Sequence, residues 1–212
     1  FSTELDKAYK DGAIRKDTIR SYRSYLNVFK EWVGDDFNNR YCIWLTRQRL
    51  QHFLDYIYYD RNTSPRTRNN HLSFWITVGE WLLKKEYVKV NPALGIEKVR
   101  QGSKKRIIIS DEDLQTIFSY LSEDNQAYYA LCMTIYYTFI RRKELAELKV
   151  KHVLLDTNTI HIPAYISKNR KDDIVTIPDR LYHILRFHLM HSAPEDYLFS
   201  VDAFKTGKKP MN

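Results

Sequence analysis

The spacing of the apolar residues constrains the fold of this chain more than any other feature, and it changes partway along the sequence. Over roughly the first 150 residues the apolar side chains recur three and four positions apart, as in amphipathic α-helices. Further on, β-branched runs occupy residues 160–162 and 174–177, on either side of the polar segment 167–173. Two such runs around a polar segment predict a β-hairpin. The sequence therefore predicts a mainly α protein with a small β-hairpin or sheet.

Three helices are predicted in the first part of the chain. An apolar stripe runs through residues 16–33, with Asp17 as the expected N-cap. A second stripe covers 46–60, and a third covers 66–86 after the helix-start signal Ser64-Pro65. Together they predict an all-α helical bundle.

A linker is predicted after this bundle. Asn91-Pro92 interrupts the helical pattern, and Gly102 and Ser103 then precede the basic run 104–106. We therefore predict a domain over residues 1–97, a basic linker over 98–107 and a second domain over 108–212.

The second domain is predicted to mix helices with the hairpin. Ser110 has the features of an N-cap, and residues 125–139 are apolar nearly all round, which predicts a deeply buried helix. A shorter helix is expected over 141–149 and another over 179–191. Tyr197 to Phe199 could form a short strand or turn.

Composition narrows the possible functions. The formal net charge is +8, and most of this surplus lies in residues 1–100, which suits a polyanionic partner. Cys42 and Cys132 show no pairing pattern, and the seven histidines show no ligand spacing, so no disulfide, metal or cofactor is expected. No apolar stretch could span a bilayer, and with 6 glycines a nucleotide-binding fold is improbable. The chain opens on Phe1, so we expect an internal piece of a longer cytoplasmic protein.

One constellation separates this sequence from a generic helical protein. Arg141 stands at the start of a predicted helix, Glu144 follows three residues later, and Lys168 lies near the hairpin tip. The strand that leaves the hairpin ends at Ile177-Pro178. On the residues alone, Arg141 and Glu144 could be a surface ion pair, and Lys168 could belong to a solvated turn.

This order resembles the start of the catalytic domain of tyrosine recombinases, the phage integrase family. Their pattern T-G-L-R-x-x-E-L-x-x-L is followed by a hairpin lysine. The resemblance implies that Arg141 is a catalytic arginine, Glu144 supports it, and Lys168 is the general acid, with Arg170 and Lys171 as close competitors. Phe139 stands where the family has glycine, and we expect this bulky residue to alter the backbone there.

Residues 18–22, 67–72 and 91–92 look like the family's core-binding domain, a SAM-like helical bundle that contacts DNA. The implied fold is this all-α domain followed by a partial α+β catalytic domain. Individually, the polar residues at 66–71 could simply begin a helix. The side chains expected to contact DNA are Arg20, Arg23, Arg66, Arg68, Asn70, His71, Lys104, Lys105, Arg106 and Arg170.

The function implied is site-specific recombination or integration through a 3′-phosphotyrosyl intermediate. The family's later His-x-x-Arg motif and nucleophilic tyrosine are not recognisable. His183 and Arg186 have the spacing of that motif, but they follow Lys168 too closely in the sequence. We therefore expect a fragment that is inactive alone. The expected partner is double-stranded DNA, in a homotetramer near the nucleoid, with no membrane and no small-molecule substrate. The alternatives are a non-catalytic DNA-binding or architectural protein and, more distantly, a helical interaction module that does not bind DNA.

Overall fold

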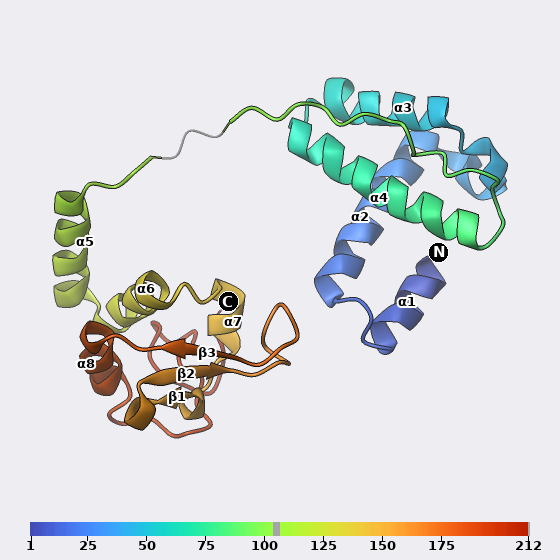
Figure 1. The fold of residues 1–212 in the computed structure, drawn as a ribbon. Coiled ribbons are helices and arrows are strands. Elements are labelled where there is room, and N and C mark those ends of the chain that lie inside the picture. Colours follow the sequence, from blue (N-terminus) through green and yellow to red (C-terminus); the bar gives the residue numbers. More distant parts are fainter. Residues whose placement is uncertain (104–106, 212) are drawn as a thin grey trace. The chain divides into compact units, whose positions relative to one another are not determined.

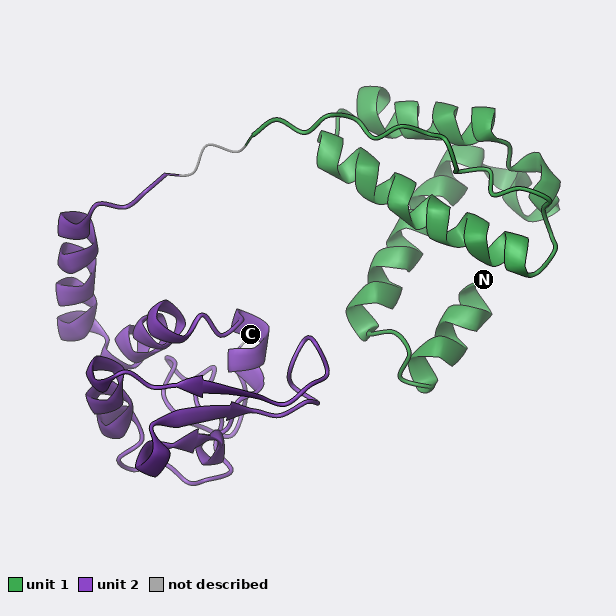
Figure 2. Cartoon of the chain, in the orientation of Figure 1, with its two compact units in different colours: residues 1–105 green, residues 106–212 purple. Residues whose placement is uncertain are grey.

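The chain forms two compact units, residues 1–105 and 106–212 (Figure 2). The computed structural model describes residues 1–103 and 107–211. Lys104, Lys105 and Arg106, three of the predicted DNA contacts, therefore lie outside the described residues. Each unit has its own hydrophobic core.

Helices are the only regular secondary structure in the described part of unit 1 (Figure 1). The helices predicted at 16–33, 46–60 and 66–86 are confirmed to within a few residues at their ends. The N-cap prediction was wrong: α2 is capped at Arg15, while Asp17 lies in its first turn and binds Arg20. A further helix had not been predicted, because it buries only Leu5. The elements are α1 (Ser2–Lys10), α2 (Lys16–Val33), η1 (Asp35–Asn39), η2 (Cys42–Trp44), α3 (Arg47–Asp55), the π-helical turn η3 (Tyr56–Asp60) and α4 (Pro65–Lys84).

The core of unit 1 contains a cluster of aromatic rings among aliphatic side chains. The ring of Phe29 lies with its centroid 4.9 Å from that of Phe53 and 4.4 Å from that of Trp75. These rings pack around Leu50 and Leu72, which are fully buried. Tilted and edge-on aromatic pairs of this kind stabilise a core beyond the area that they bury, by roughly 0.5–1.5 kcal/mol each.

The segment after α4 is fixed to that helix by a buried amide. Asn91 donates hydrogen bonds to the Ile76 carbonyl (3.0 Å) and to a Glu80 carboxylate oxygen (2.9 Å), and its Oδ1 accepts one from the Ala93 N–H (2.9 Å). Gly79 faces this amide so closely that an added Cβ would stand 1.9 Å from Asn91 Oδ1. Glycine at position 79 is therefore required by a close approach.

Unit 2 combines helices with a three-stranded antiparallel sheet in the order β1-β2-β3 (Figure 1). The predicted hairpin is confirmed: Ile160 pairs with Val175 and Ile162 with Asp173. The third strand of the sheet, β1, was not predicted, because its two residues are too few to show a periodic pattern. The elements are α5 (Asp111–Asp124), α6 (Gln126–Thr138), α7 (Arg142–Glu147), η4 (Val150–His152), β1 (Val153–Leu154), η5 (Leu155–Thr157), β2 (Thr159–Ile162), β3 (Asp173–Thr176) and α8 (Asp179–His188).

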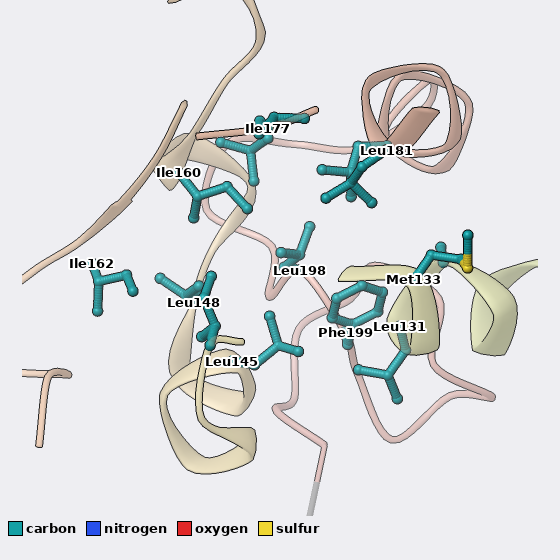
Figure 3. Close-up of a cluster of buried hydrophobic side chains, with 14 of the residues drawn as sticks. Leu131, Met133, Leu145, Leu148, Ile160, Ile162, Ile177, Leu181, Leu198 and Phe199 are labelled. Carbon is teal, nitrogen blue, oxygen red and sulfur yellow. The ribbon is translucent and has the colours of Figure 1, made fainter. Parts of the chain in front are cut away.

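The core of unit 2 is mainly aliphatic. Figure 3 shows Leu145 from α7, Ile160 from β2 and Leu181 from α8 gathered around Leu198, and all four are fully buried. The cap predicted at Ser110 is confirmed, because its hydroxyl accepts from the Asp113 N–H. The deep burial predicted for residues 125–139 is wrong for one face, where Ile135 and Tyr136 are 37% and 46% exposed. Helix α6 packs on α5 and α8 but leaves this face open among the described residues.

No helix in the described part of either unit is both long enough and apolar enough to cross a membrane.

The structure confirms the predicted architecture. It is a mainly α fold with one small sheet, as the spacing of the apolar residues indicated.

Candidate functional site

The turn between α6 and α7 delivers Arg141 to the surface of unit 2. Helix α6 ends at Thr138, whose hydroxyl donates to the Thr134 carbonyl (2.5 Å) and accepts from the Ile140 N–H (3.3 Å). Ile140 is buried, and Arg141 then begins α7 as its N-cap residue. The buried threonine hydroxyl thus fixes the backbone one residue before Arg141.

Phe139 occupies the sharpest point of this turn. Its backbone is left-handed, with φ 52° and ψ 19°, the region that glycine adopts freely. The turn therefore has a geometry that glycine favours, although a bulky phenylalanine occupies the position. The ring lies in solvent, since Phe139 is 85% exposed. A left-handed residue with a side chain costs about 1–2 kcal/mol.

Glu144 is the centre of the site. Its carboxylate, 4% exposed, lies on the first turn of α7. One oxygen, Oε1, accepts from the Arg141 guanidinium (3.0 Å) and from the backbone N–H of Lys168 (2.7 Å), while Oε2 accepts from the Arg141 N–H (3.3 Å). A single buried carboxylate therefore joins Arg141, the N-cap residue of α7, to the β2–β3 loop, where Lys168 lies 24 residues after Glu144.

These contacts decide the charge of Glu144. Burial by itself would raise the pKa of the carboxyl, but the hydrogen bonds from the Lys168 N–H and from Arg141 outweigh it, so the pKa of Glu144 is lowered. The carboxylate is therefore ionised at neutral pH and keeps both partners in place. A surface ion pair, the simplest interpretation of Arg141 and Glu144, does not describe a carboxylate that is buried and shared.

The loop that carries Lys168 is closed at its base. Asp172 accepts a hydrogen bond from the Ala164 N–H (3.1 Å) and lies 3.3 Å from His161 Nε2 on β2. Ser167 is buried immediately before Lys168, while the side chains of Lys168 and Arg170 are exposed. Arg170 has a left-handed backbone (φ 56°), which completes the turn at the tip. The loop thus holds its backbone inside and presents cationic side chains outside.

Among the predicted catalytic residues, the structure brings Arg141, Glu144 and the Lys168 backbone together. The Arg141 side chain is 54% exposed, so its guanidinium is held by Glu144 and still open to a ligand. Arg142 and Lys143, which follow it in the sequence, are exposed as well, and so is Lys171 on the β2–β3 loop. Guanidinium and ammonium groups arranged in this way can bind phosphoryl oxygens by charge-assisted hydrogen bonds.

In unit 1 the predicted DNA contacts fall into two groups. Arg66 and Asn70 are exposed on α4. Arg20 and Arg23 are exposed on α2, where they form ion pairs with Asp17 and Asp6. Exposed pairs of this kind contribute little stability, so these arginines can exchange partners readily.

Two predicted DNA contacts are corrected by the structure. Arg68, 3% exposed, donates to the Glu97 carbonyl (2.6 Å), and His71, 4% exposed, packs against the ring of Tyr25 at 4.6 Å. Burial, together with the positive charge of Arg61, lowers the pKa of His71 to about 4. These side chains face the interior of unit 1 and cannot reach a bound duplex without leaving it.

The residues that fix the backbone at the site and at the end of unit 1 were not predicted from the sequence. Thr138 could have been found from its place three residues before Arg141 in the arginine motif. The amide of Asn69, which donates to the Val99 carbonyl (2.8 Å) and accepts from the Val99 N–H (3.0 Å), had no local signal. Within the described ranges, no group of three or more His, Cys, Asp or Glu side chains could hold a metal ion.

Comparison with curated proteins gives the family context. Over 219 residues the chain is 22% identical to a tyrosine recombinase XerD from Rickettsia bellii, a match that covers 100% of this chain and 68% of the relative. A tyrosine recombinase XerD from Rickettsia prowazekii is 24% identical over 184 residues, covering 83% of this chain and 58% of the relative. The chain thus spans 58% to 68% of the length of these curated relatives.

Solved structures share the fold at low sequence identity. A lambda integrase fragment, crystallised as a dimer bound to a COC′ core site, is 11% identical with a TM-score of 0.72, and the match covers 100% of this chain and 74% of that one. The Tn1549 transposon integrase, solved in complex with circular intermediate DNA, is 12% identical with a TM-score of 0.68, covering 98% and 71%.

The sequence model of the phage integrase family matches residues 108–212, which begin just before α5 and contain Arg141, Glu144 and Lys168. Tyrosine recombinases are thus the curated relatives of the chain, and integrases share its fold. The chain belongs to the phage integrase family of tyrosine recombinases.

Proposed function

We propose that this chain acts on DNA as part of a site-specific tyrosine recombinase or integrase, with unit 1 as its core-binding domain and unit 2 as the first part of its catalytic domain. The observation that carries the proposal is the triple hydrogen bonding of Glu144. It holds an arginine and a lysine-bearing loop together, in the region that matches the integrase family. Such an arrangement suits the charge that develops on a phosphoryl group during transfer.

Each residue has a distinct role in this proposal. Arg141 binds non-bridging oxygens of the scissile phosphate, because a guanidinium stays ionised and donates two parallel hydrogen bonds. Lys168 protonates the departing 5′-oxygen, and Glu144 positions both segments without touching DNA. The nucleophilic tyrosine and the His-x-x-Arg motif are supplied outside residues 1–212. Attack by that tyrosine forms a 3′-phosphotyrosyl bond and conserves the phosphodiester's energy for rejoining.

DNA binding is assigned to exposed cations and amides. In unit 1 these are Arg20, Arg23, Arg66 and Asn70, and in unit 2 Arg170. The basic run 104–106 is included on its sequence alone. Such contacts to phosphate mainly set position and register. By analogy with the lambda integrase structures, solved as a dimer on a core site and as a tetramer on a Holliday junction, we propose a homotetramer on DNA in the cytoplasm.

The test is a salt titration of duplex DNA binding by the chain and its variants. Affinity should fall steeply with salt, by roughly 0.9 log units per log unit of salt for each phosphate neutralised. Arg141→Ala and Arg66→Ala should each lower this slope by about one phosphate contact. Arg186→Ala, which removes an exposed arginine from α8, is the matched control and should leave the slope unchanged. Binding that is insensitive to salt and to all three variants would reject DNA as the partner.

Phe139 favours one alternative, a DNA-binding or architectural protein that keeps the fold without catalysis. Its ring stands in a strained turn, where the family has glycine. Covalent trapping on nicked DNA, in the protein extended past residue 212, separates the two. Under our proposal Arg141→Ala should reduce trapping by about 10²–10³-fold. Absence of trapping in the extended wild-type protein, with DNA binding intact, would favour the alternative.

A further inference from the structure

Phe139 is an aromatic side chain whose position its own unit does not explain. Among the described residues, two phenylalanines have left-handed backbones, Phe139 and Phe204. The ring of Phe204 is partly buried, lies 5.0 Å from the ring of Tyr128 and packs against the core of unit 2, which offsets its backbone strain. Phe139 has the same backbone strain, but its ring is 85% exposed. Strain that persists without packing in the folded unit points to a role outside it.

The position of Phe139 identifies what such a ring would meet. Arg141 is two residues away, so the two Cα atoms are separated by at most about 7.6 Å. The Thr138 hydroxyl and the buried Ile140 fix the backbone on both sides of Phe139, so the ring is presented from a rigid turn. Successive nucleotides of one DNA strand are about 3.4 Å apart along the helix axis. A phosphate held by Arg141 therefore brings its own nucleoside or the adjacent one within reach of the ring.

We propose that Phe139 binds the sugar and base of the nucleotide next to the phosphate held by Arg141. The site would thus combine a guanidinium for the phosphate with an aromatic surface for the adjoining nucleoside, a pairing that proteins use on unpaired or distorted strands. This inference rests on the proposed function and adds a contact that glycine at the same position could not make.

Two interference experiments on one DNA test the proposal. The probe is a duplex selected by the chain itself from a random-sequence pool, so no target site needs to be known beforehand. Phosphate ethylation maps the phosphates needed for binding, and the position lost in Arg141→Ala identifies the phosphate of Arg141. Hydroxyl-radical removal of single nucleosides maps the bases and sugars needed. We expect wild-type protein to require a nucleoside within one position of the Arg141 phosphate, and Phe139→Asn to lose that requirement.

The variants are chosen so that the turn stays folded. Asparagine tolerates the left-handed region, so Phe139→Asn removes the ring and keeps the backbone. Its affinity should fall about 5- to 100-fold, the effect of losing one base–aromatic contact. Phe139→Tyr keeps a ring and should keep both the affinity and the nucleoside signal. Phe187→Asn, at a 58% exposed phenylalanine on α8, controls for loss of an exposed ring and should leave both unchanged.

The outcomes separate this inference from the function on which it rests. If Phe139→Asn binds as tightly as wild type and gives the same nucleoside pattern, the inference is overturned. An Arg141-dependent phosphate in the same data would leave the proposed function standing. If no phosphate depends on Arg141, both fail together.

Discussion

The two units bury polar side chains for opposite purposes. In unit 1, Arg68, Asn69 and Asn91 are buried, and their hydrogen bonds hold the backbone of the segment that follows α4. In unit 2, Glu144 is buried, and its hydrogen bonds hold the exposed Arg141 and the loop of Lys168. The arrangement in unit 1 uses buried polar side chains to fix the backbone, and the arrangement in unit 2 uses a buried carboxylate to hold an exposed guanidinium and a cationic loop. A basic residue in a DNA-binding sequence is therefore a candidate contact only after its burial is known.

The cores differ as well, which makes the comparison measurable. All four tryptophans of the chain, Trp32, Trp44, Trp75 and Trp81, lie in unit 1, whereas the core of unit 2 is mainly aliphatic. Tryptophan fluorescence during urea unfolding therefore reports on unit 1 alone. Hydrogen exchange of the β2–β3 amides reports on unit 2. A substitution that affects one unit should therefore change one signal and leave the other as it is.

The largest expected effect is that of Gly79→Ala on unit 1. The new methyl group would collide with the Asn91 amide and break buried hydrogen bonds, at a cost of about 4 kcal/mol. The tryptophan transition should move to much lower urea, with exchange of the β2–β3 amides unchanged. Gly102→Ala is the matched control, because its added Cβ meets nothing within 4 Å. A Gly79→Ala protein as stable as wild type would contradict the placement of Asn91.

Acidification should weaken unit 1 by nearly as much, through His71. The folded-state pKa is about 4 and the ordinary value is 6.5, so the unfolded chain takes up the proton first. The stability that unit 1 gains from a neutral His71 is therefore fully present above pH 6.5. It is lost as the pH falls from 6.5 toward 4, and the free energy of unfolding should decrease by about 3 kcal/mol in all. Urea titrations followed by tryptophan fluorescence across this range measure it. In His71→Phe this pH dependence should disappear, and its persistence would mean that another group is responsible.

The smallest expected effect is a gain of stability in unit 2. Phe139→Gly relieves a left-handed backbone, and because glycine is also more flexible in the unfolded chain, the net gain should be about 1 kcal/mol or less. Hydrogen exchange of the β2–β3 amides should slow accordingly. Phe139→Ala keeps the strain and should give no gain. Equal stabilisation by both variants would show that the exposed ring, rather than the backbone, is the unfavourable feature.

The helices of both units other than α1 could be predicted from the sequence because each obeys a local rule. The stripe in α2 has helical period, and Ser110 and Ser64 accept from the N–H groups of their own first turns. The misassignment of Arg68 and His71 was also avoidable. They share a stripe with Leu72 and Trp75 at the i, i+3, i+4 spacing of a buried face, whereas Arg66 lies off it.

The candidate site could be predicted only in part. Arg141 and Glu144 are three residues apart, so their pairing follows from helix geometry. The choice of Lys168 over Arg170 and Lys171 was uncertain from the sequence. In the structure the Lys168 N–H donates to Glu144, a contact that depends on how the hairpin packs on α7, and the role of the Lys168 side chain as general acid stays a prediction. Contacts between residues so far apart in the chain leave no local pattern.

Amide hydrogen exchange at Lys168 tests the central claim, that one buried carboxylate holds both cationic segments, most directly. It would be compared in the wild-type chain, in Glu144→Ala and in Glu147→Ala, which removes an exposed carboxylate from the same helix. We predict a protected Lys168 amide in wild type and in Glu147→Ala. In Glu144→Ala its exchange should be at least about tenfold faster, as expected when a buried hydrogen bond is lost. Equal exchange at Lys168 in all three proteins would show that Glu144 does not hold the loop, and the account of the site would fail.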